Sequence, residues 1–413
     1  MDKFNQLIDK LGGYFQLDIR YYIKNSFFLI LAQGVSIGLS ILLSIAFARL
    51  LTQDLYGQWS YILSIIGLLA IFSLPGMSTA INQAVARGHD RVLIEGTKVR
   101  FKWSILGSIA IFGVGIYYLL SGSVLLGKSL MICSLLFPFY VNLTGYSAFL
   151  SGKKQFDKVA AYNIIAEVIS IPVTILIIYL SRNLLLILIA YLVTVSLVRA
   201  YYFWLTSRIA NNASHDERAI PFGKQVTVTG IPGLISMYGD KILIGILLTF
   251  PELAVYSIAL ASSNVVRYLV NPIASLTFPK LSVMDEKEAY TAVKRRYIYV
   301  VLAMIVISGI AVLLFPFLIP FFYTQIYVDA VLYSQILLVG LIFGIPNTIL
   351  TKALFPSQRK AKEIFKFEIV RIVIRTLLLV SLTLRFGLLG VPLAIAITTF
   401  LTMIYSWRLA KWI

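Results

Sequence analysis

About a dozen long apolar segments run through this 413-residue chain, and they constrain its fold more than any other feature. A helix rises about 1.5 Å per residue, so about 20 apolar residues cross a hydrocarbon core of roughly 30 Å. The segments lie near residues 26–50, 57–76, 103–121, 124–148, 160–180, 184–206, 226–249, 253–276, 297–322, 332–354, 369–385 and 388–407. The pattern predicts an all-α integral membrane protein with about 12 transmembrane helices.

The composition agrees with this prediction, because 59% of the residues are hydrophobic and only 13% are charged. A soluble chain carries roughly 25% charged residues. The net charge of +18 is typical of nucleic-acid binding at first sight. In a membrane protein, however, basic loops hold the cytoplasmic ends of helices in place. We therefore expect a membrane as partner and no nucleic acid.

Basic residues are distributed unevenly between alternate loops, and this predicts the orientation. The N-terminus and every second loop hold 26 basic residues, among them Arg100 between the second and third segments. The opposite loops hold four, which are Arg49, Lys128, Arg182 and Arg385. Positively charged loops stay on the cytoplasmic side. We therefore expect a multi-pass protein of the cell inner (plasma) membrane with both termini in the cytoplasm.

A polar stretch divides the segments six and six, at residues 207–225. It predicts an N-terminal six-helix bundle over 1–206 and a C-terminal one over 226–413. The two halves are also similar in sequence, since Leu-Leu-Thr at 50–52 recurs at 247–249. Six-helix repeats have the same topology and place the substrate site between them. We therefore expect two pseudo-symmetric bundles around a central cavity that work by alternating access.

Several sequence stretches, in this order and spacing, resemble the polysaccharide (O-antigen type) flippases of the multidrug/oligosaccharidyl-lipid/polysaccharide exporter superfamily. They are AFARLLTQDLYGQWS at 46–60, LPGMSTAINQAVAR at 74–87, FLSGKKQF at 149–156, GDKILIGILLTFPELAVYSIA at 239–259 and LTFPKLS at 276–282. The resemblance implies translocation of a lipid-linked oligosaccharide from the cytoplasmic to the external leaflet. It also implies an undecaprenyl diphosphate type of lipid and polysaccharide assembly proteins as partners.

Charged residues inside the segments are the candidate substrate-binding residues. Each costs about 2.5–3.5 kcal/mol at a helix centre, so it should face a cavity or a partner. Asp240 and Lys241 lie in the seventh segment, and Arg267 lies in the eighth with Asn264 and Asn271 on the same helix face. Arginine suits a diphosphate because of its planar fork of donors, and asparagine suits sugar hydroxyls. Lys241 could instead pair with Asp240 or snorkel.

Other charges within the segments keep two interpretations open. Arg49, at the end of the first segment, is a candidate substrate ligand or an interface anchor. Asp240 and Glu167 are candidates for ion coupling, and each could instead be a structural partner of another helix. Arg371 and Arg375 lie near the cytoplasmic end of their segment, where they could line the cavity or snorkel.

Two other classes of function remain as alternatives. A cation-coupled exporter of small molecules from the same superfamily would need a mainly acidic cavity, whereas cations are at least as frequent as acids in these segments. A membrane polysaccharide polymerase would need a large external loop with catalytic residues, and the external loops are short. We therefore expect no enzyme activity. His89, His215 and Cys133 do not have the spacing of a metal site, so we also expect no metal and no cofactor.

Overall fold

The computed structural model describes residues 19–210, 214–270, 281, 284–358 and 360–410. Within these ranges every regular element is a helix. The chain forms two compact units, which are described one at a time. The described residues of Met1–Leu43 and Leu69–Val228 form unit 1, and those of Ser44–Leu68 and Thr229–Ile413 form unit 2. The predicted six-helix bundles at 1–206 and 226–413 stay a prediction from the sequence repeat.

Unit 1 contains most of α2 and the chain from η1 to the start of α10. Its elements are α2 (Ile19–Leu50), η1 (Ala70–Ser73), α4 (Met77–Ala86), α5 (Val92–Leu120), α6 (Val124–Asn142), α7 (Gly145–Gly152), α8 (Phe156–Ser181), α9 (Leu184–Ile209) and α10 (Ala219–Leu247). The chain leaves this unit within α2 and again within α10.

Unit 2 contains the end of α2, α3, most of α10 and the C-terminal helices. Its further elements are α3 (Gln53–Leu69), α11 (Phe250–Val270), α13 (Glu286–Tyr323), η2 (Gln325–Tyr327), α14 (Asp329–Ile349), η3 (Leu350–Leu354), α15 (Phe355–Ser357), α16 (Ala361–Phe386), η4 (Gly387–Leu389) and α17 (Gly390–Ala410). The element η3 is a π-helix. Such helices are rare in proteins, and those that occur are often found at functional sites.

The predicted fold class is confirmed, because each predicted segment overlaps one long helix of the described chain. Ten described stretches have the length and hydropathy of membrane spans. The last of these stretches, Lys362–Ala410, contains both α16 and α17. The protein is therefore an all-α, multi-pass membrane protein.

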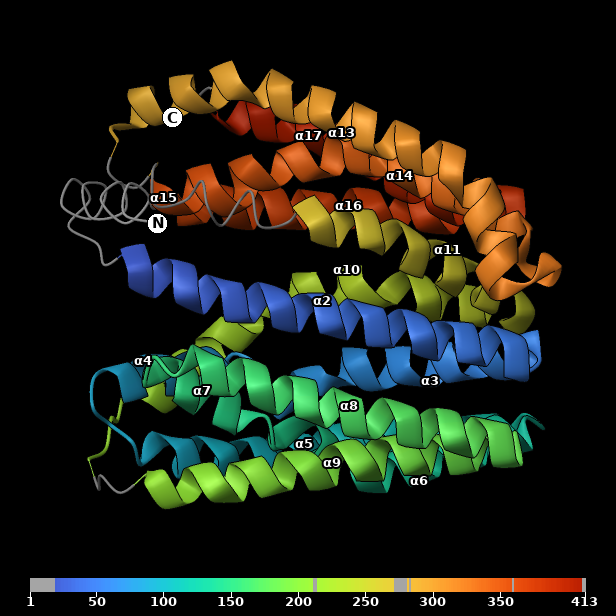
Figure 1. The fold of residues 1–413 in the computed structure, drawn as a ribbon, viewed down its shortest axis with the longest axis horizontal. Helices are drawn as coiled ribbons and strands as arrows, with labels where there is room; N and C mark the ends of the chain where they lie inside the picture. The colour runs from blue at the N-terminus through green and yellow to red at the C-terminus, as the bar shows by residue number, and fades with distance from the viewer. Residues whose placement is uncertain (1–18, 211–213, 271–280, 282–283, 359, 411–413) are drawn as a thin grey trace, which may run out of the picture. The chain divides into compact units, whose positions relative to one another are not determined.

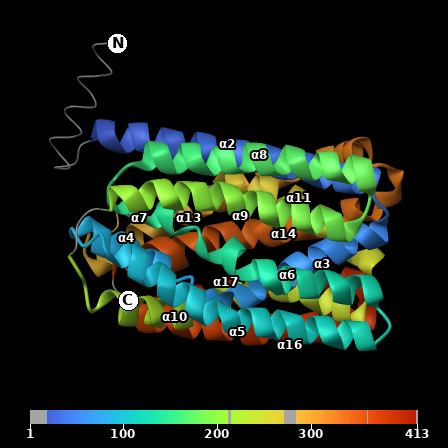
Figure 2. The same ribbon diagram turned by 90° about the horizontal axis from the view of Figure 1, so that it is seen from below.

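In unit 1, α5 and α6 lie side by side along much of their length (Figure 2). Glycines make this close approach possible. A Cβ atom on Gly127 would lie 2.8 Å from the backbone oxygen of Gly115. Packing of α6 on α9 and of α8 on α9 completes this set of helices. A larger residue at Gly127 would therefore separate α5 from α6.

Arg100 joins two helix breaks within unit 1. The first follows η1, where Leu74 adopts a left-handed conformation (φ 53°), and the second separates α6 from α7. Carbonyl groups at such ends have no partner within their own helix. The Arg100 guanidinium donates to the carbonyls of Ser73 (3.1 Å), Val141 (2.6 Å) and Asn142 (3.3 Å), and to Thr144 Oγ1 (3.2 Å). We call these residues the Arg100 clamp.

The position of Arg100 corrects a prediction from the sequence. Arg100 was expected in a cytoplasmic loop, but it lies on α5 and is only 3% exposed. The loop prediction is wrong because α5 begins at Val92, eleven residues before the apolar segment near 103–121. Its polar first turns are covered by other parts of unit 1.

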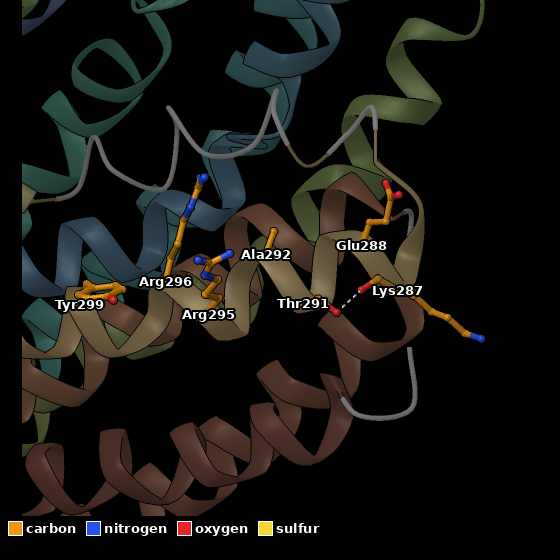
Figure 3. Close-up of a pocket in the computed structure, with 7 residues that line it drawn as sticks. All are labelled: Lys287, Glu288, Thr291, Ala292, Arg295, Arg296 and Tyr299. Atoms are coloured by element: carbon orange, nitrogen blue, oxygen red, sulfur yellow. Dashed lines mark hydrogen bonds between the residues drawn. The ribbon is translucent and has the colours of Figure 1, made fainter.

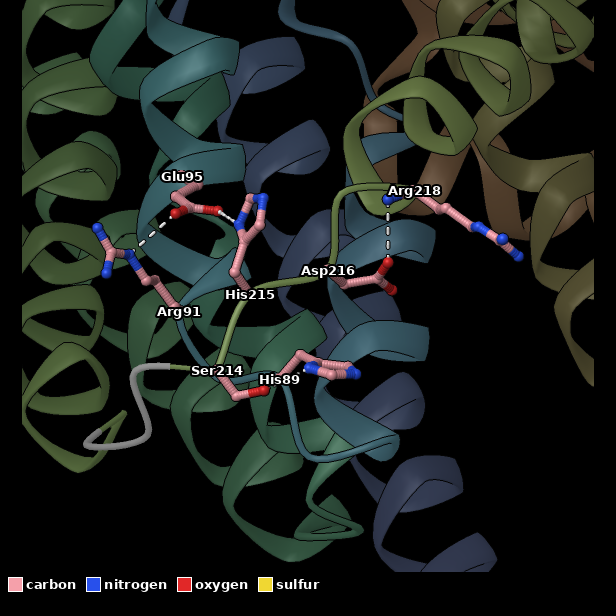
Figure 4. A network of polar contacts seen from close by, with 7 residues as sticks. All are labelled: His89, Arg91, Glu95, Ser214, His215, Asp216 and Arg218. Atoms are coloured by element: carbon pink, nitrogen blue, oxygen red, sulfur yellow. Dashed lines mark hydrogen bonds and ion pairs between the residues drawn. The ribbon is translucent and has the colours of Figure 1, made fainter.

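A polar network ties the connection between α9 and α10 to the start of α5 (Figure 4). His215 Nδ1 lies 2.6 Å from Glu95 Oε2, and Arg91 forms an ion pair of 2.9 Å with the same carboxylate. His89 Nδ1 lies 2.6 Å from Ser214 Oγ. These contacts hold the described part of the connection against the start of α5 and the residues just before it.

In unit 2, α14 packs against α11, α13 and α17, and α16 packs against α17 (Figure 1). One apolar core cluster joins the start of α13 to η3, α15 and the end of α17. The side chains that α13 contributes are Ala289, Val293 and Tyr297, which recur every four residues and so form one face. This core holds the first turns of α13 and the π-helix in fixed positions.

Candidate functional site

The carboxylate of Asp240 is the centre of the candidate site in unit 2. Asp240 lies on α10 and is 2% exposed. Its Oδ2 atom accepts a hydrogen bond of 2.5 Å from the hydroxyl of Tyr256 on α11, and it lies 3.3 Å from Arg375 Nη2 on α16. Its Oδ1 atom accepts the backbone N–H of Lys241 at 2.9 Å. One side chain therefore connects three helices.

The turn between α10 and α11 explains why Asp240 meets Tyr256. Thr249 and Glu252 form a capping box: Thr249 donates its backbone N–H to Glu252 Oε2 (2.9 Å), and the Glu252 N–H reaches Thr249 Oγ1 (3.4 Å). This turn ends α10 and starts α11 with few residues between them. Asp240 lies eight residues before Leu248 and Tyr256 eight residues after it. The two side chains therefore lie at the same level of the helix pair.

More cations than acids surround this carboxylate. Arg267 on α11 is exposed and interacts electrostatically with both Asp240 and Arg375. Lys352, on the π-helix η3, interacts electrostatically with Arg267 and Arg371. We define the Asp240 cluster by its eight members: Asp240, Lys241, Tyr256, Arg267, Lys352, Glu368, Arg371 and Arg375. Five of them are basic and two are acidic, so the cluster has an excess of positive charge.

Some donors in the Asp240 cluster have no partner among the described residues. Arg371 and Glu368 form an ion pair of 2.5 Å along α16. The Nε atoms of Arg371 and Arg375 are buried, and neither makes a hydrogen bond within the described chain. Arg375 also lines a small cavity of about 110 Å³ together with Ser236, whose buried hydroxyl is likewise unpartnered there. Unused donors and excess positive charge are suited to an anionic ligand.

The structure brings three of the predicted site residues together, namely Asp240, Lys241 and Arg267. Asn264 lies on α11 one turn before Arg267 and is half-buried. Asn271 lies outside the described residues. Among the described residues, no hydrogen bond or ion pair joins Arg267 to another group, and its charge interacts with those of Arg375 and Asp240.

The other two predicted residues lie elsewhere. Arg49 Nε donates to the carbonyl of Phe322 (2.8 Å) and its Nη2 to that of Phe321 (2.5 Å), at the C-terminal end of α13. Basic side chains commonly bind the last carbonyls of a helix in this way. Glu167 belongs to unit 1, where its Oε2 atom is buried without a hydrogen bond among the described residues. Substrate binding by Arg49 and ion coupling by Glu167 stay predictions.

Sequence reasoning did not find every member of the Asp240 cluster. The pairing of Arg375 with Asp240 joins positions 135 residues apart, and no sequence pattern indicates it. Tyr256 was one of many tyrosines. Lys352 carried a signal that was overlooked: it is a single lysine near the end of an apolar segment, at residues 332–354. An intramembrane cation is a candidate functional residue for the reason already given for Arg267.

The class of the protein follows from its fold. The structure is similar to that of "Lipid II flippase MurJ, inward closed conformation" with a TM-score of 0.66 and 16% identity, over 92% of this chain and 87% of that one. It is also similar to the crystal structure of a MATE mutant (TM-score 0.58, 14% identity, 95% of both chains). A MOP superfamily transporter from Pyrococcus furiosus, described with reverse polarity of its binding pocket, matches with a TM-score of 0.59 and 12% identity over 95% of this chain and 94% of that one. The protein therefore has the fold of these membrane transporters.

The family follows from the sequence. The model of the polysaccharide biosynthesis protein family matches residues 22–285, which is more than half of the chain. This chain therefore belongs to the polysaccharide biosynthesis protein family. No curated protein matches the sequence. The expected family resemblance is confirmed.

Proposed function

We propose that this protein is a flippase that translocates a polyprenyl-diphosphate-linked oligosaccharide, such as an O-antigen or capsule repeat unit, from the cytoplasmic to the external leaflet. The proposal extends what family membership establishes, which is a membrane protein of polysaccharide biosynthesis. One similar structure is that of a lipid II flippase, which supports the same class of reaction for this chain. We also propose that the protein lies in the cell inner membrane with both termini in the cytoplasm.

The observation that carries the proposal is the excess of cations in the Asp240 cluster. A diphosphate has several negative charges and acceptor oxygens, and arginine forks bind such groups with two parallel hydrogen bonds. Arg267 is exposed and is proposed to bind the head group first. Within the part of the chain that the structure describes, the Nε donors of Arg371 and Arg375 are unused. The lipid chain would stay in the bilayer while the charged head group crosses.

Each remaining predicted residue has a proposed role. Lys241 adds positive charge beside Asp240, and Asn264 and Asn271 offer amides to sugar hydroxyls. Arg49 is proposed to bind the substrate or to stabilise the C-terminal end of α13, whose carbonyls it contacts. Asp240 and Glu167 are the proposed positions for the coupling ion. The bundles at 1–206 and 226–413 are proposed to rock during alternating access.

Reconstitution in proteoliposomes tests the proposal. Purified protein in phosphatidylcholine vesicles should move undecaprenyl diphosphate carrying a fluorescent disaccharide between leaflets, as measured by its access to an external quencher. Arg267→Ala should reduce the rate by at least tenfold while the protein stays folded. Arg385→Ala, which removes an exposed arginine from the far end of α16, is the matched control and should leave the rate unchanged. No translocation by the natural chain would overturn the proposal.

An exporter of cationic small molecules is the second candidate. The similarity to MATE transporters and the buried carboxylate of Asp240 favour it. The surrounding cations disfavour it, since they would repel a cationic substrate. Export of ethidium from loaded proteoliposomes distinguishes the two candidates: ethidium transport that needs Asp240, with no movement of the lipid, would support the exporter.

A further inference from the structure

The first turns of α13 carry a surface groove outside the Asp240 cluster. The groove has a volume of about 860 Å³, within the range of pockets that bind small molecules. Arg295, Arg296 and Tyr299 lie at one end of it, and Glu288 and Thr291 lie toward the start of the helix (Figure 3). All of these residues belong to unit 2.

The described residues that line the groove all belong to α13. Ala292 lies in the middle of the groove, one turn from Arg295 and Arg296. The buried face of α13, with Ala289 and Val293, lies on the other side of the helix and is fixed by the apolar core. The groove is therefore attached to a rigid support.

The start of α13 is also held by polar contacts. Glu286 forms an ion pair of 3.0 Å with Lys360, next to the start of α16. The Gln358 side chain donates to the backbone carbonyls of Leu281 (2.9 Å) and Met284 (3.3 Å). A fixed helix start limits the ordering cost when a ligand binds.

Chemical groups follow a definite order along the groove. The two guanidinium groups lie nearest to the apolar part of α13, with the Tyr299 ring next to them and 67% exposed. The acceptor Glu288 lies two turns away from Arg296 toward the helix start, over a distance of about 12 Å for eight helical residues. Lys287 points away from the arginines in Figure 3. The two arginines therefore lie toward the apolar part of α13, and Thr291 and Glu288 lie toward its polar start, where Lys287 also lines the groove.

We infer that this groove is a loading site for the head group of the lipid-linked oligosaccharide, with the diphosphate on Arg295 and Arg296 and the sugars along Thr291 toward Glu288. This inference rests on the proposed function. A lipid of this kind has its diphosphate at the membrane surface and its sugars farther out, which is the order of the groove. An anionic phospholipid would use the arginines alone, since it has no glycan to reach Glu288.

Binding in nanodiscs of phosphatidylcholine tests the inference with three probes, which are undecaprenyl diphosphate carrying a disaccharide, undecaprenyl diphosphate alone, and phosphatidylglycerol. The double variant Arg295→Gln/Arg296→Gln should bind both diphosphates at least tenfold more weakly. Ala292→Leu fills the hollow without a change of charge and should weaken only the glycan-bearing lipid. Lys294→Gln removes an exposed charge that does not line the groove, and it should bind all probes as the natural chain does.

Two outcomes would overturn the inference. One is a loss in Lys294→Gln equal to that in the double variant, which would indicate a general positive surface. The other is equal competition by phosphatidylglycerol, which would indicate a phospholipid head-group site. Translocation assays separate this inference from the proposed function: a natural chain that translocates the lipid, with a double variant that binds and translocates equally well, would overturn only the loading site.

Discussion

Arg100 in unit 1 is buried and Arg375 in unit 2 is half-buried, and their surroundings are opposite in kind. Every nitrogen of Arg100 donates to a carbonyl or hydroxyl group of the Arg100 clamp, and no acid takes part. Arg375 contacts Asp240 with one nitrogen, keeps a buried Nε without a partner among the described residues, and lies among other cations. All three nitrogens of Arg100 are therefore already used as donors. Arg375 can still donate a hydrogen bond to a further acceptor.

The comparison shows how two arginines in apolar segments can be distinguished. An arginine whose donors are saturated by helix-end carbonyls stabilises the fold. An arginine with unused donors near other cations is suited to binding an anion. Saturation of the donors, and not burial alone, therefore separates Arg100 from Arg375, for which we propose a binding role.

The largest expected effect breaks the Arg100 clamp. Arg100→Ala should lower the free energy of unfolding by about 3 kcal/mol, because it removes the Arg100 donors of three helix-end carbonyls, of which only that of Val141 keeps the hydroxyl of Thr144. Thermal unfolding in detergent, followed by tryptophan fluorescence, measures this loss. Lys98→Ala removes an exposed charge from the same helix and should have little effect. Equal stability of the natural chain and Arg100→Ala would remove the structural role of the clamp.

A smaller effect is expected when Asp240, the acid that pairs with Arg375, loses its charge. Asp240→Asn keeps an acceptor for Tyr256 but weakens the hold on Arg375. Undecaprenyl diphosphate should then bind about tenfold more tightly, which corresponds to about 1.4 kcal/mol. Translocation should become slower because release is harder. Titration in nanodiscs measures the affinity, and weaker binding in Asp240→Asn would contradict the idea that Asp240 competes with the ligand.

The smallest expected effect concerns the hydroxyl of Tyr256. Tyr256→Phe removes one buried hydrogen bond to Asp240, and it should destabilise the protein by about 1 kcal/mol. Tyr268→Phe, at an exposed position of the same helix, is the matched control. The two variants can be compared by the same thermal unfolding measurement. An identical result for both would mean that Tyr256 does not help to hold the carboxylate.

The membrane fold could be predicted from the sequence because the signal is local. A run of about 20 apolar residues specifies a span without reference to the rest of the chain. Asp240, Lys241 and Arg267 were found for a related reason, since a charge in such a run is conspicuous by itself. The predicted spans and these three residues therefore needed no knowledge of tertiary contacts.

The partners of these charges could not be predicted, because they depend on contacts between distant segments. The sequence predicted Arg100 as a loop charge. In the structure, the ends of η1 and α6 surround it. The sequence alone was equally consistent with an Arg375 side chain that snorkels to the membrane surface. The structure shows instead that Arg375 pairs with Asp240. In both cases the sequence places the cation at the edge of a span, and only the packing of helices decides what it binds.

The capping box at Thr249 and Glu252 has a consequence for tolerance to mutation. Insertion of a single residue between Asp240 and this turn would rotate the preceding part of α10 by about 100° relative to α11. The carboxylate would then face away from Tyr256, although every residue of both helices would still be present. Deletions and insertions here should therefore be far more harmful than substitutions, and the length of this hairpin is itself a functional property of the protein.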